Sequence, residues 1–239
     1  VLWMKLQRKR GFYEQYIKRL CDIICSLLAI ICFSWLYIIL AIFVRMKLGS
    51  PVLFRQPRPG MIDKKTGKER IFDMYKFRTM SDERGANGEL LSDEERLGKF
   101  GRMLRRSSLD ELPEAFNILI GDMSIIGPRP QLVKDMVFMS DEIRKRHTAK
   151  PGLSGLAQVM GRNAIGWKKK FEWDLEYIEH ISFWNDLKIL GLTVMKVFGA
   201  KTVDTSEETN ITWDYGDALL YEKKVTQEKY DALQTHARN

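Results

Sequence analysis

A run of 22 uncharged residues, at positions 23–44, constrains the fold of this chain more than any other feature. At about 1.5 Å per residue, a continuous helix of this length is roughly 33 Å long, enough to reach across the apolar part of a bilayer. A buried helix of a soluble core is the alternative, but bulky apolar side chains occupy every face of the run. The run ends in Phe43, Val44 and Arg45 rather than in the small residues of a signal-peptide cleavage site, so we expect it to remain in the mature protein.

Basic residues lie on both sides of this run and bear on how it enters the membrane. They are Lys5, Arg8, Lys9, Arg10, Lys18 and Arg19 before the run, and Arg45, Lys47, Arg55 and Arg58 after it. Basic flanks stay on the cytoplasmic side, so a single crossing would misplace one of them. A helix that enters the membrane, bends near Ser34 and returns keeps both flanks in the cytoplasm. The sequence therefore predicts a re-entrant helix, and the aromatic residues Trp35 and Tyr37 in the middle of the run are a weaker indication of the bend.

The overall composition narrows the classes of ligand without choosing one. The 39 Lys and Arg residues outnumber the 31 Asp and Glu residues, and the net charge of +8 suits phosphate-bearing ligands, nucleic acid or an anionic membrane surface. The three cysteines, Cys21, Cys25 and Cys32, all lie in or beside the apolar run. None is left in the polar part of the sequence for a disulfide framework or a zinc site, which indicates a reducing compartment.

The rest of the chain predicts an α+β fold that is mostly helical. Short apolar stretches punctuated by proline and glycine over residues 49–77 predict a small element of two strands and a turn. Residues 167–197 have the periodicity of two amphipathic helices, and their aromatic and lysine residues suit a membrane surface as well as they suit a solvated face. We divide the chain into a membrane helix with its flank (1–48), a core (49–200) and a polar C-terminal appendage (201–239) that contains a helix at 216–233.

Two adjacent carboxylates, Asp110 and Glu111, are the strongest chemical signal in the core. Residues 112–121 have helical spacing with Pro113 suited to a first turn, so we expect the pair at a helix N-terminus. In one interpretation Asp110 only caps this helix and Glu111 favours its dipole. In the other, the pair forms a phosphate-and-metal site near Arg105, because an Asp can attack phosphorus while a neighbouring Glu holds a divalent cation. Spacing alone does not decide between them.

Two arginines farther along the chain are candidate phosphate ligands. Arg129 lies between Pro128 and Pro130, which restrict the backbone, so its guanidinium has less entropy to lose on binding an anion. A structural turn with a solvated arginine is the alternative. Arg162 lies near the end of a glycine-rich stretch at residues 150–163, which we expect to be a loop. A glycine-rich loop alone is weak support for phosphate binding.

From about residue 19 to residue 197, the sequence resembles the monotopic phosphoglycosyl transferases, a family of bacterial sugar transferases, in its small PglC-like members that consist of the catalytic core alone. The motifs occur in the family's order. They are FRQPRPG at 54–60, YKFRTM at 75–80, LGKFG at 97–101, SLDELP at 108–113, GDMS at 121–124, GPRP at 127–130 and KPGLSG at 150–155. So many ordered motifs make chance agreement improbable.

The resemblance implies a magnesium-dependent exchange in two steps. Asp110 would attack the sugar-linked phosphate of a UDP-sugar, releasing UMP and leaving a phosphosugar on the enzyme, which polyprenol (undecaprenyl) phosphate would then accept. Glu111 would bind the metal together with Asp110. The positions that the family uses for phosphate and nucleotide are occupied by Lys76, Arg105, Arg129 and Arg162. The reaction brings several phosphate charges together, and positioned cations offset them.

The resemblance also implies a location and partners. We expect the protein in the bacterial inner (cytoplasmic) membrane, with its catalytic core on the cytoplasmic face and with UDP-sugar, polyprenol phosphate and membrane lipid as partners. No basic-aromatic motif favours nucleic acid, and the sequence leaves open whether the chain forms a homo-oligomer. In one departure from the family, Ser34 is followed by Trp35 where Ser-Pro is common, which removes the strongest local cause of a helix bend.

Two alternatives remain open at this point. Within the same chemistry, the donor could carry a hexose rather than an N-acetylated amino sugar. Outside enzymology, a basic protein anchored in the membrane could be a binding or scaffold protein, such as a regulator of polysaccharide assembly. Release of UMP from a UDP-sugar in the presence of polyprenol phosphate distinguishes an enzyme from a scaffold.

Overall fold

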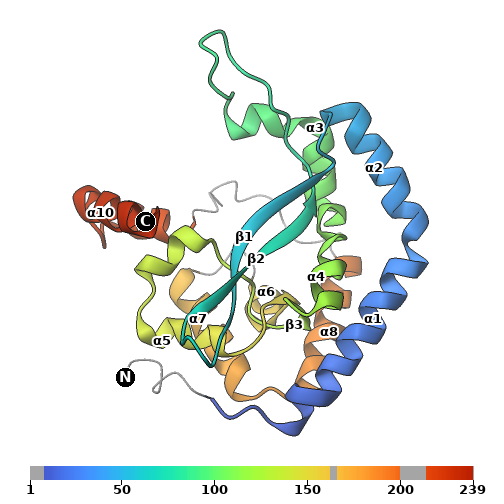
Figure 1. The fold of residues 1–239 in the computed structure, drawn as a ribbon, viewed down its shortest axis with the longest axis vertical. Helices are drawn as coiled ribbons and strands as arrows, with labels where there is room; N and C mark the ends of the chain where they lie inside the picture. The colour runs from blue at the N-terminus through green and yellow to red at the C-terminus, as the bar shows by residue number, and fades with distance from the viewer. Residues whose placement is uncertain (1–7, 162–165, 200–213, 239) are drawn as a thin grey trace. The chain divides into compact units, whose positions relative to one another are not determined.

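A computed structural model describes residues 8–161, 166–199 and 214–238 of the chain. The described residues are mostly helical with two small sheets (Figure 1), as the sequence predicts. They fall into two compact units. The first unit comprises the described parts of Val1–Leu20, Pro57–Phe72 and Asp122–Asn239, and the second comprises Cys21–Gln56 and Asp73–Gly121. These units combine separate stretches of the chain, whereas the predicted membrane, core and C-terminal segments are continuous in sequence. The predicted segments therefore stay a prediction.

The N-terminal helices contain the bend that the sequence predicts. A π-helical turn, η2 (Tyr13–Ile17), leads into α1 (Lys18–Cys32), and α2 (Ser34–Leu48) follows after one residue. The two helical segments meet at an angle of 63° (Figure 1). Within the described residues, no single helix is long and apolar enough to cross a bilayer, whereas this bent pair together meets the criteria of length and composition.

The break between α1 and α2 lies at Phe33, one residue before the predicted position. The carbonyl oxygen of Phe33 accepts hydrogen bonds from the backbone N–H groups of Leu36 and Tyr37, at 2.9 and 3.0 Å. In an apolar surrounding, backbone groups that a bend releases need such partners. The bend therefore forms without the proline that is common in the family.

The predicted strand element is present as β1 (Leu53–Ile62) and β2 (Glu69–Phe77), which pair with each other. Six residues connect them, too few for a parallel crossover, so the pair is an antiparallel hairpin. The second unit continues with α3 (Asp93–Arg106), η3 (Leu109–Glu111) and α4 (Glu114–Ile120). Its apolar core packs Leu40 and Val44 of α2 against Phe77 and Leu104. This core holds the second half of the apolar run against the segment that carries the two carboxylates.

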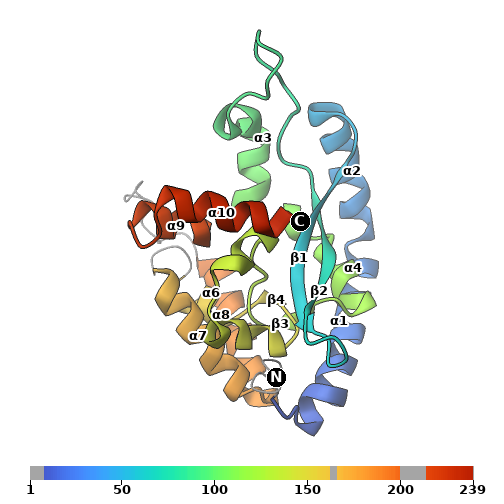
Figure 2. The ribbon, with the colours of Figure 1, turned by 60° about the vertical axis from the view of Figure 1, so that its left-hand side comes forward.

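The first unit contains a second sheet that the sequence did not indicate. Strands β3 (Ser124–Ile126) and β4 (Gly152–Ser154) pair in parallel, with Ser124 opposite Gly152 (Figure 2). The glycine-rich stretch predicted as a loop is instead β4 followed by α6 (Leu156–Met160), so that prediction is wrong. A Cβ atom on Gly152 would lie 2.0 Å from the backbone nitrogen of Gly127. Glycine is needed there because the two backbones approach closely.

The remaining elements of the first unit are helical. They are η4 (Val133–Phe138), α5 (Asp141–Arg144), η5 (Lys145–Thr148), α7 (Trp167–Glu179), α8 (Phe183–Gly199), α9 (Tyr215–Tyr221) and α10 (Gln227–Arg238). The pair α7 and α8 confirms the two helices predicted over residues 167–197. The single C-terminal helix predicted at 216–233 is wrong, because α9 ends at Tyr221 and α10 begins at Gln227. One apolar core of this unit packs Ile126, Tyr177 and Ile189 together.

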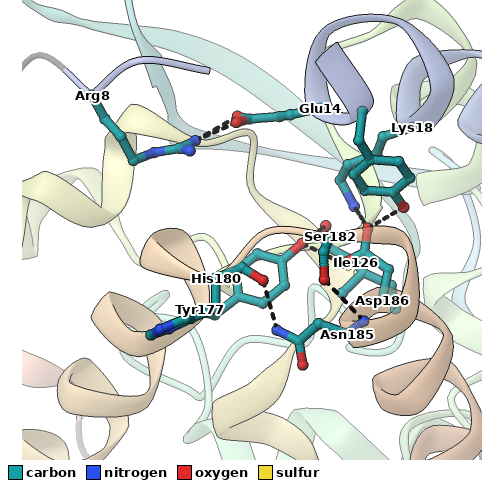
Figure 3. A network of polar contacts seen from close by, with 10 residues as sticks. Arg8, Glu14, Lys18, Ile126, Tyr177, His180, Ser182, Asn185 and Asp186 are labelled. Atoms are coloured by element: carbon teal, nitrogen blue, oxygen red, sulfur yellow. Dashed lines mark hydrogen bonds and ion pairs between the residues drawn. The ribbon is translucent and has the colours of Figure 1, made fainter. Parts of the chain in front are cut away.

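A buried ion pair ties the start of α1 to α8 within the first unit (Figure 3). The ammonium group of Lys18 lies 2.5 Å from a carboxylate oxygen of Asp186, and the hydroxyl of Tyr13 donates to the same oxygen at 2.8 Å. The other carboxylate oxygen of Asp186 accepts a hydrogen bond from the Tyr177 hydroxyl at 2.7 Å. The Asp186 carboxylate is thus surrounded by partners, as a buried charge must be. The residues that precede the apolar run are thereby held to α8.

Candidate active site

The adjacent carboxylates lie in a short turn rather than in a regular helix. Asp110 and Glu111 belong to the one-turn 3₁₀-helix η3, and Ser108 before it has left-handed backbone angles, with φ 55° and ψ 19°. The following helix, α4, begins at Glu114 and has Pro113 at its N-cap, with no side-chain hydrogen bond to the cap. The expectation that the pair starts this helix is therefore wrong. Asp110 does not cap α4, and the capping interpretation fails with it.

Lys76, near the end of β2, binds two carboxylates of this segment. Its Nζ atom lies 2.8 Å from Oε1 of Glu111 and 3.2 Å from Oε1 of Glu114. The Glu114 side chain is only 2% exposed, and that of Lys76 is 15% exposed, so both charges are largely withdrawn from water. A pair with this geometry and burial fixes the position of the ammonium group.

Asp110 differs from these two glutamates in its electrostatic surroundings. The residue is buried, and burial raises the pKa of its carboxyl group above the ordinary value. The nearby charges of Lys76 and Arg105 lower the pKa, whereas the charge of Glu111 raises it, and burial prevails. A carboxylate that has lost much of its hydration, yet lies close to cations, is a suitable nucleophile for a phosphate centre.

Four of the six predicted site residues therefore come together in the second unit: Lys76, Arg105, Asp110 and Glu111. The Nε group of Arg105 donates to the hydroxyl of Thr79 at 3.1 Å, which orients its guanidinium from α3. Arg129 belongs to the first unit. Arg162 lies outside the described residues, so its predicted role stays a prediction.

The segment around Arg129 is held by its backbone. The carbonyl oxygen of Arg129 accepts a hydrogen bond from Nη2 of Arg146 at 2.6 Å, and the same guanidinium pairs with Asp174 of α7 at 2.6 Å. The side chain of Arg129 is partly buried, and its charge approaches Lys170, whose pKa is lowered by burial first and by Arg129 second. Two cations that lie this close together favour an anion beside them. This arrangement speaks against a fully solvated arginine in a mere turn.

Three residues of the second unit support the carboxylate turn through contacts that the sequence did not indicate. The hydroxyl of Tyr37 in α2 donates to the carbonyl oxygen of Leu112 at 2.6 Å. The amide of Asn117 in α4, which is fully buried, accepts from the N–H of Tyr75 at 2.9 Å and donates to the carbonyl of Asp73 at 2.7 Å. Glu114 is the third, through Lys76. An Asn inside an apolar helix stretch and a Tyr inside an apolar run are the signals that could have indicated such buried hydrogen bonds.

The carboxylates fit a magnesium ion of the kind that binds together with substrate. Among the described residues, no group of three or more His, Cys, Asp or Glu side chains could hold a metal ion. Magnesium, however, is usually bound by one or two carboxylates with substrate phosphates and water as the other ligands, not by an all-protein cage. Asp110 and Glu111 offer adjacent hard oxygen donors, which suits that mode of binding.

Comparisons with known proteins show the family of the chain. Residues 13–200 match the family model described as bacterial sugar transferase. An uncharacterized sugar transferase of Bacillus subtilis (strain 168), EpsL, is 46% identical over 194 residues, which cover 81% of this chain and 92% of that protein.

Two longer relatives have names that state an activity. The UDP-glucose:undecaprenyl-phosphate glucose-1-phosphate transferase of Xanthomonas campestris pv. campestris is 39% identical, with 81% of this chain and 41% of that protein covered. The UDP-N-acetylgalactosamine-undecaprenyl-phosphate N-acetylgalactosaminephosphotransferase of Aeromonas hydrophila is 36% identical, with 78% of this chain and 45% of that protein covered. The chain thus spans less than half the length of these two relatives.

Proposed function

The chain belongs to the bacterial sugar transferase family, and we propose that it moves a sugar 1-phosphate from a UDP-sugar to undecaprenyl phosphate through a covalent intermediate on Asp110. The observation that carries this proposal is the buried Asp110 carboxylate, which lies in the field of Lys76 and Arg105 and does not cap a helix. The two longer relatives are named as transferases to undecaprenyl phosphate, one from UDP-glucose and the other from UDP-N-acetylgalactosamine. As a phosphoglycosyl transferase, the enzyme would carry out the first membrane step in assembling a bacterial glycoconjugate.

In the first step, a carboxylate oxygen of Asp110 forms a bond to the phosphorus that carries the sugar. The bond from this phosphorus to the bridging oxygen breaks, and UMP leaves with the electron pair. In the second step, a phosphate oxygen of undecaprenyl phosphate attacks the same phosphorus, and the acyl-phosphate bond to Asp110 breaks. The products are the undecaprenyl diphosphate sugar and a regenerated carboxylate, so the enzyme returns to its starting state.

The cations near Asp110 have a defined role in this scheme. Lys76 and Arg105 offset negative charge on the diphosphate, and Glu114 keeps Lys76 in place while the substrate is absent. Magnesium, held by Asp110 and Glu111, would supply Lewis-acid stabilisation of phosphate charge. Arg129 and Arg162 are the further phosphate and nucleotide ligands that we propose from the family pattern.

We propose a re-entrant membrane helix and a cytoplasmic catalytic core at the inner membrane. Two contacts support this topology. Before the apolar run, Lys18 and Tyr13 bind Asp186 in α8 (Figure 3). After the bend, Leu40 and Val44 of α2 pack with Phe77 and Leu104. The residues before the run and the last residues of the run thus each contact segments that follow the run in the chain, which suits a helix that returns to the side from which it enters.

Helix α8 adds a surface for membrane lipid. Its exposed apolar side chains recur at helical spacing and end in a methionine: Phe183, Trp184, Leu187, Leu190, Val194 and Met195. Trp184 is 75% exposed, which is unusual for so large an apolar side chain unless another surface covers it. Because Asp186 of the same helix binds Lys18, α8 starts beside the residues that enter the membrane. An amphipathic helix in this place suits the headgroup level.

The test of the proposed function is a screen of UDP-sugars with the purified full-length chain, undecaprenyl phosphate and magnesium. We expect UMP release with at least one UDP-sugar, dependent on the lipid for continued turnover. UDP-glucose and UDP-N-acetylgalactosamine are the first donors to compare, because the relatives named above use one or the other. A chain that binds these donors but releases no UMP with any of them would be a scaffold protein instead.

The topology has a separate test. In a variant without Cys21, Cys25 and Cys32, a cysteine replaces Lys9, and a membrane-impermeant reagent is applied to intact and to permeabilised cells. The re-entrant helix predicts labelling only after permeabilisation. Labelling in intact cells would place the N-terminal flank in the periplasm and overturn the re-entrant helix, but not the transferase. Trp35→Pro, which restores the family's Ser-Pro, should be tolerated because α2 already begins at Ser34.

A further inference from the structure

The C-terminal helices dock on the segment that follows Arg129. The carboxylate of Asp135 in η4 accepts hydrogen bonds from the backbone N–H groups of Tyr215, at 3.3 Å, and Gly216, at 2.9 Å. Asp135 is only 1% exposed, so these bonds are shielded from water. Its neighbour Lys134 lies 3.0 Å from Asp214 and 3.1 Å from Asp217. The start of α9 is thereby fixed to a residue six positions after Arg129 in the chain.

Helix α10 contacts the same element, η4. The ring of Tyr230 stacks on that of Phe138 with 5.3 Å between the centroids, and the Tyr230 hydroxyl donates to Asp217. The amide of Gln234 donates to the carbonyl oxygen of Lys134 at 3.1 Å. We call residues 214–238 the C-terminal clasp, because α9 and α10 hold η4 through separate contacts.

A second path of contacts leads from the clasp to Arg129 through α7. The Tyr215 ring packs edge-to-face on Phe171, with 4.9 Å between centroids. Phe171 also contacts the guanidinium of Arg146, which lies 5.5 Å from the centroid of the ring. This guanidinium is the group that donates to the carbonyl oxygen of Arg129. Arg146 and Phe171 are 1% and 3% exposed, so the path is close-packed and excludes water.

We propose that the C-terminal clasp positions Arg129 for the reaction, through η4 on one side and through Phe171 and Arg146 on the other. The proposal rests on the proposed function, since it concerns the phosphate ligand of that reaction. The clasp begins after residue 200, where the family match ends, so this support is not part of the matched family core. Its residues act through Arg129 and are positioning residues. A guanidinium on a fixed backbone binds phosphate with less loss of entropy than one on a mobile loop.

Gly216 offers a specific way to loosen the clasp. A Cβ atom there would lie 2.5 Å from Cε2 and 2.8 Å from Cδ2 of Phe138, too close for either ring atom to stay in place. Gly216→Ala should therefore push α9 away from η4. Gly191→Ala is the matched control, because Gly191 lies in helix α8 of the same unit and its Cβ would meet nothing within 4 Å. Asp135→Asn is a milder variant that keeps the size of the side chain and weakens the bonds to α9.

The first readout is a double-mutant cycle on kcat/KM for the UDP-sugar in the full-length enzyme. We expect Gly216→Ala to lower kcat/KM about fivefold, Asp135→Asn less, and Gly191→Ala not at all. In an Arg129→Ala background, Gly216→Ala should have no further effect, because the group that the clasp positions is gone. Losses that multiply in the double variant would show that the clasp does not act through Arg129 and would overturn the proposal. So would an inert Gly216→Ala.

The second readout does not depend on activity. Hydrogen exchange followed by mass spectrometry should show faster exchange over residues 129–138 in Gly216→Ala and in Asp135→Asn than in the wild type or in Gly191→Ala. Unchanged exchange in this segment would overturn the clasp whatever the kinetics. Absence of UMP release from the wild type would instead refute the proposed function, so the two failures are distinguishable.

Discussion

Two buried carboxyl groups, one in each compact unit, have pKa values that shift in opposite directions. Asp110 in the second unit is 7% exposed and Glu69 in the first unit is 8% exposed. Burial raises the pKa of Asp110. Burial would raise that of Glu69 as well, but hydrogen bonds from His147 and Arg144 lower it to about 2. Burial alone therefore determines neither the direction of the pKa shift nor the role of a carboxyl group.

The difference lies in direct partners. Glu69 accepts two hydrogen bonds from Arg144, at 2.9 and 2.6 Å, and is 3.0 Å from Nδ1 of His147. Asp110 lies near Lys76 and Arg105, but Lys76 is bound to the neighbouring glutamates. A carboxylate whose charge is matched by a hydrogen-bonded cation is structural, whereas one whose pKa burial raises, with cations only nearby, keeps its oxygens reactive.

The largest effect is expected at Asp110. Asp110→Asn should abolish turnover, because an amide is a far poorer nucleophile at phosphorus than a carboxylate. Glu111→Gln should be severely impaired through loss of metal binding and of its pair with Lys76. Initial rates of UMP release measure both. If Asp110→Asn turns over within tenfold of the wild-type rate, Asp110 is not the catalytic carboxylate that distinguishes this site from Glu69.

The corresponding substitution at Glu69 should affect stability instead of chemistry. Glu69→Gln leaves Arg144 without its charge partner, and breaking a buried ion pair costs roughly 3–5 kcal/mol. The lower end applies, because the Arg144 side chain is 27% exposed and can regain some water. Denaturant unfolding measures the loss, and the fraction that remains folded should keep its kcat. The control is Glu142→Gln, whose side chain is 64% exposed and should cost almost nothing.

A smaller loss is expected at Arg129. Arg129→Ala should lower kcat/KM at least tenfold with the fold intact, since a charge-assisted contact to phosphate contributes roughly 1.5–3 kcal/mol. Arg129→Lys should recover part of the activity because it keeps the charge but not the planar fork. Lys145→Ala, which removes a cation from an exposed pair in the same unit, is the control. Wild-type kinetics in folded Arg129→Ala would reduce the Pro-Arg-Pro segment to a structural turn.

Tyr37 tests whether helix α2 supports the carboxylate turn. Tyr37→Phe removes only the hydroxyl that donates to Leu112, and one such bond contributes about 1 kcal/mol. We expect a loss of that size in unfolding free energy and a fall in kcat of a few fold, since the turn that carries Asp110 loses an anchor. Tyr16→Phe, at a residue that is 62% exposed, should change neither. An unchanged kcat for Tyr37→Phe would limit this tyrosine to packing.

The smallest effects concern pH, where the two carboxyl groups should differ in sign. Glu69 stabilises the fold above its ordinary pKa of 4.5, and this contribution is lost as the pH falls through about 2. Asp110, with its raised pKa, contributes stability at low pH that is lost as the pH rises, so Asp110→Asn should unfold at a slightly higher temperature at neutral pH. Because protonated Asp110 is not a nucleophile, kcat/KM should decline below an acidic pKa higher than the ordinary 3.8. An Asp110→Asn variant that unfolds at a lower temperature than the wild type at neutral pH would contradict this difference in sign.

The sequence predicted what is encoded in local patterns. The bend near Ser34 follows from the basic residues on both sides of the apolar run, and the strand hairpin follows from short apolar stretches between turn residues. The grouping of Lys76 and Arg105 with Asp110 and Glu111 follows from the family resemblance that the ordered motifs carry. The parallel pair of β3 and β4 was not predicted, because each strand has three residues and the contact joins positions 28 apart. A sequence does not distinguish a glycine that adjoins a phosphate from one that adjoins another backbone, as Gly152 does.

The residues that support the carboxylate turn were also not predicted from the sequence. Asn117 and Tyr37 act through backbone carbonyl groups that only the tertiary fold brings near. The composition of the C-terminal appendage indicates only a polar segment, yet Tyr215 connects it to Asp135 in the segment after Arg129 across 80 positions of sequence. Long-range contacts of buried polar groups leave little trace in local periodicity.

The most direct test of the central claim is the location of the phosphosugar on the enzyme. The full-length chain is incubated with an accepted UDP-sugar and magnesium but without undecaprenyl phosphate, quenched, digested and mapped by mass spectrometry. We predict a sugar-phosphate adduct on the peptide that contains Asp110, lost on addition of undecaprenyl phosphate and absent from Asp110→Asn. An adduct on another residue, or one that persists in Asp110→Asn, would contradict Asp110 as the nucleophile.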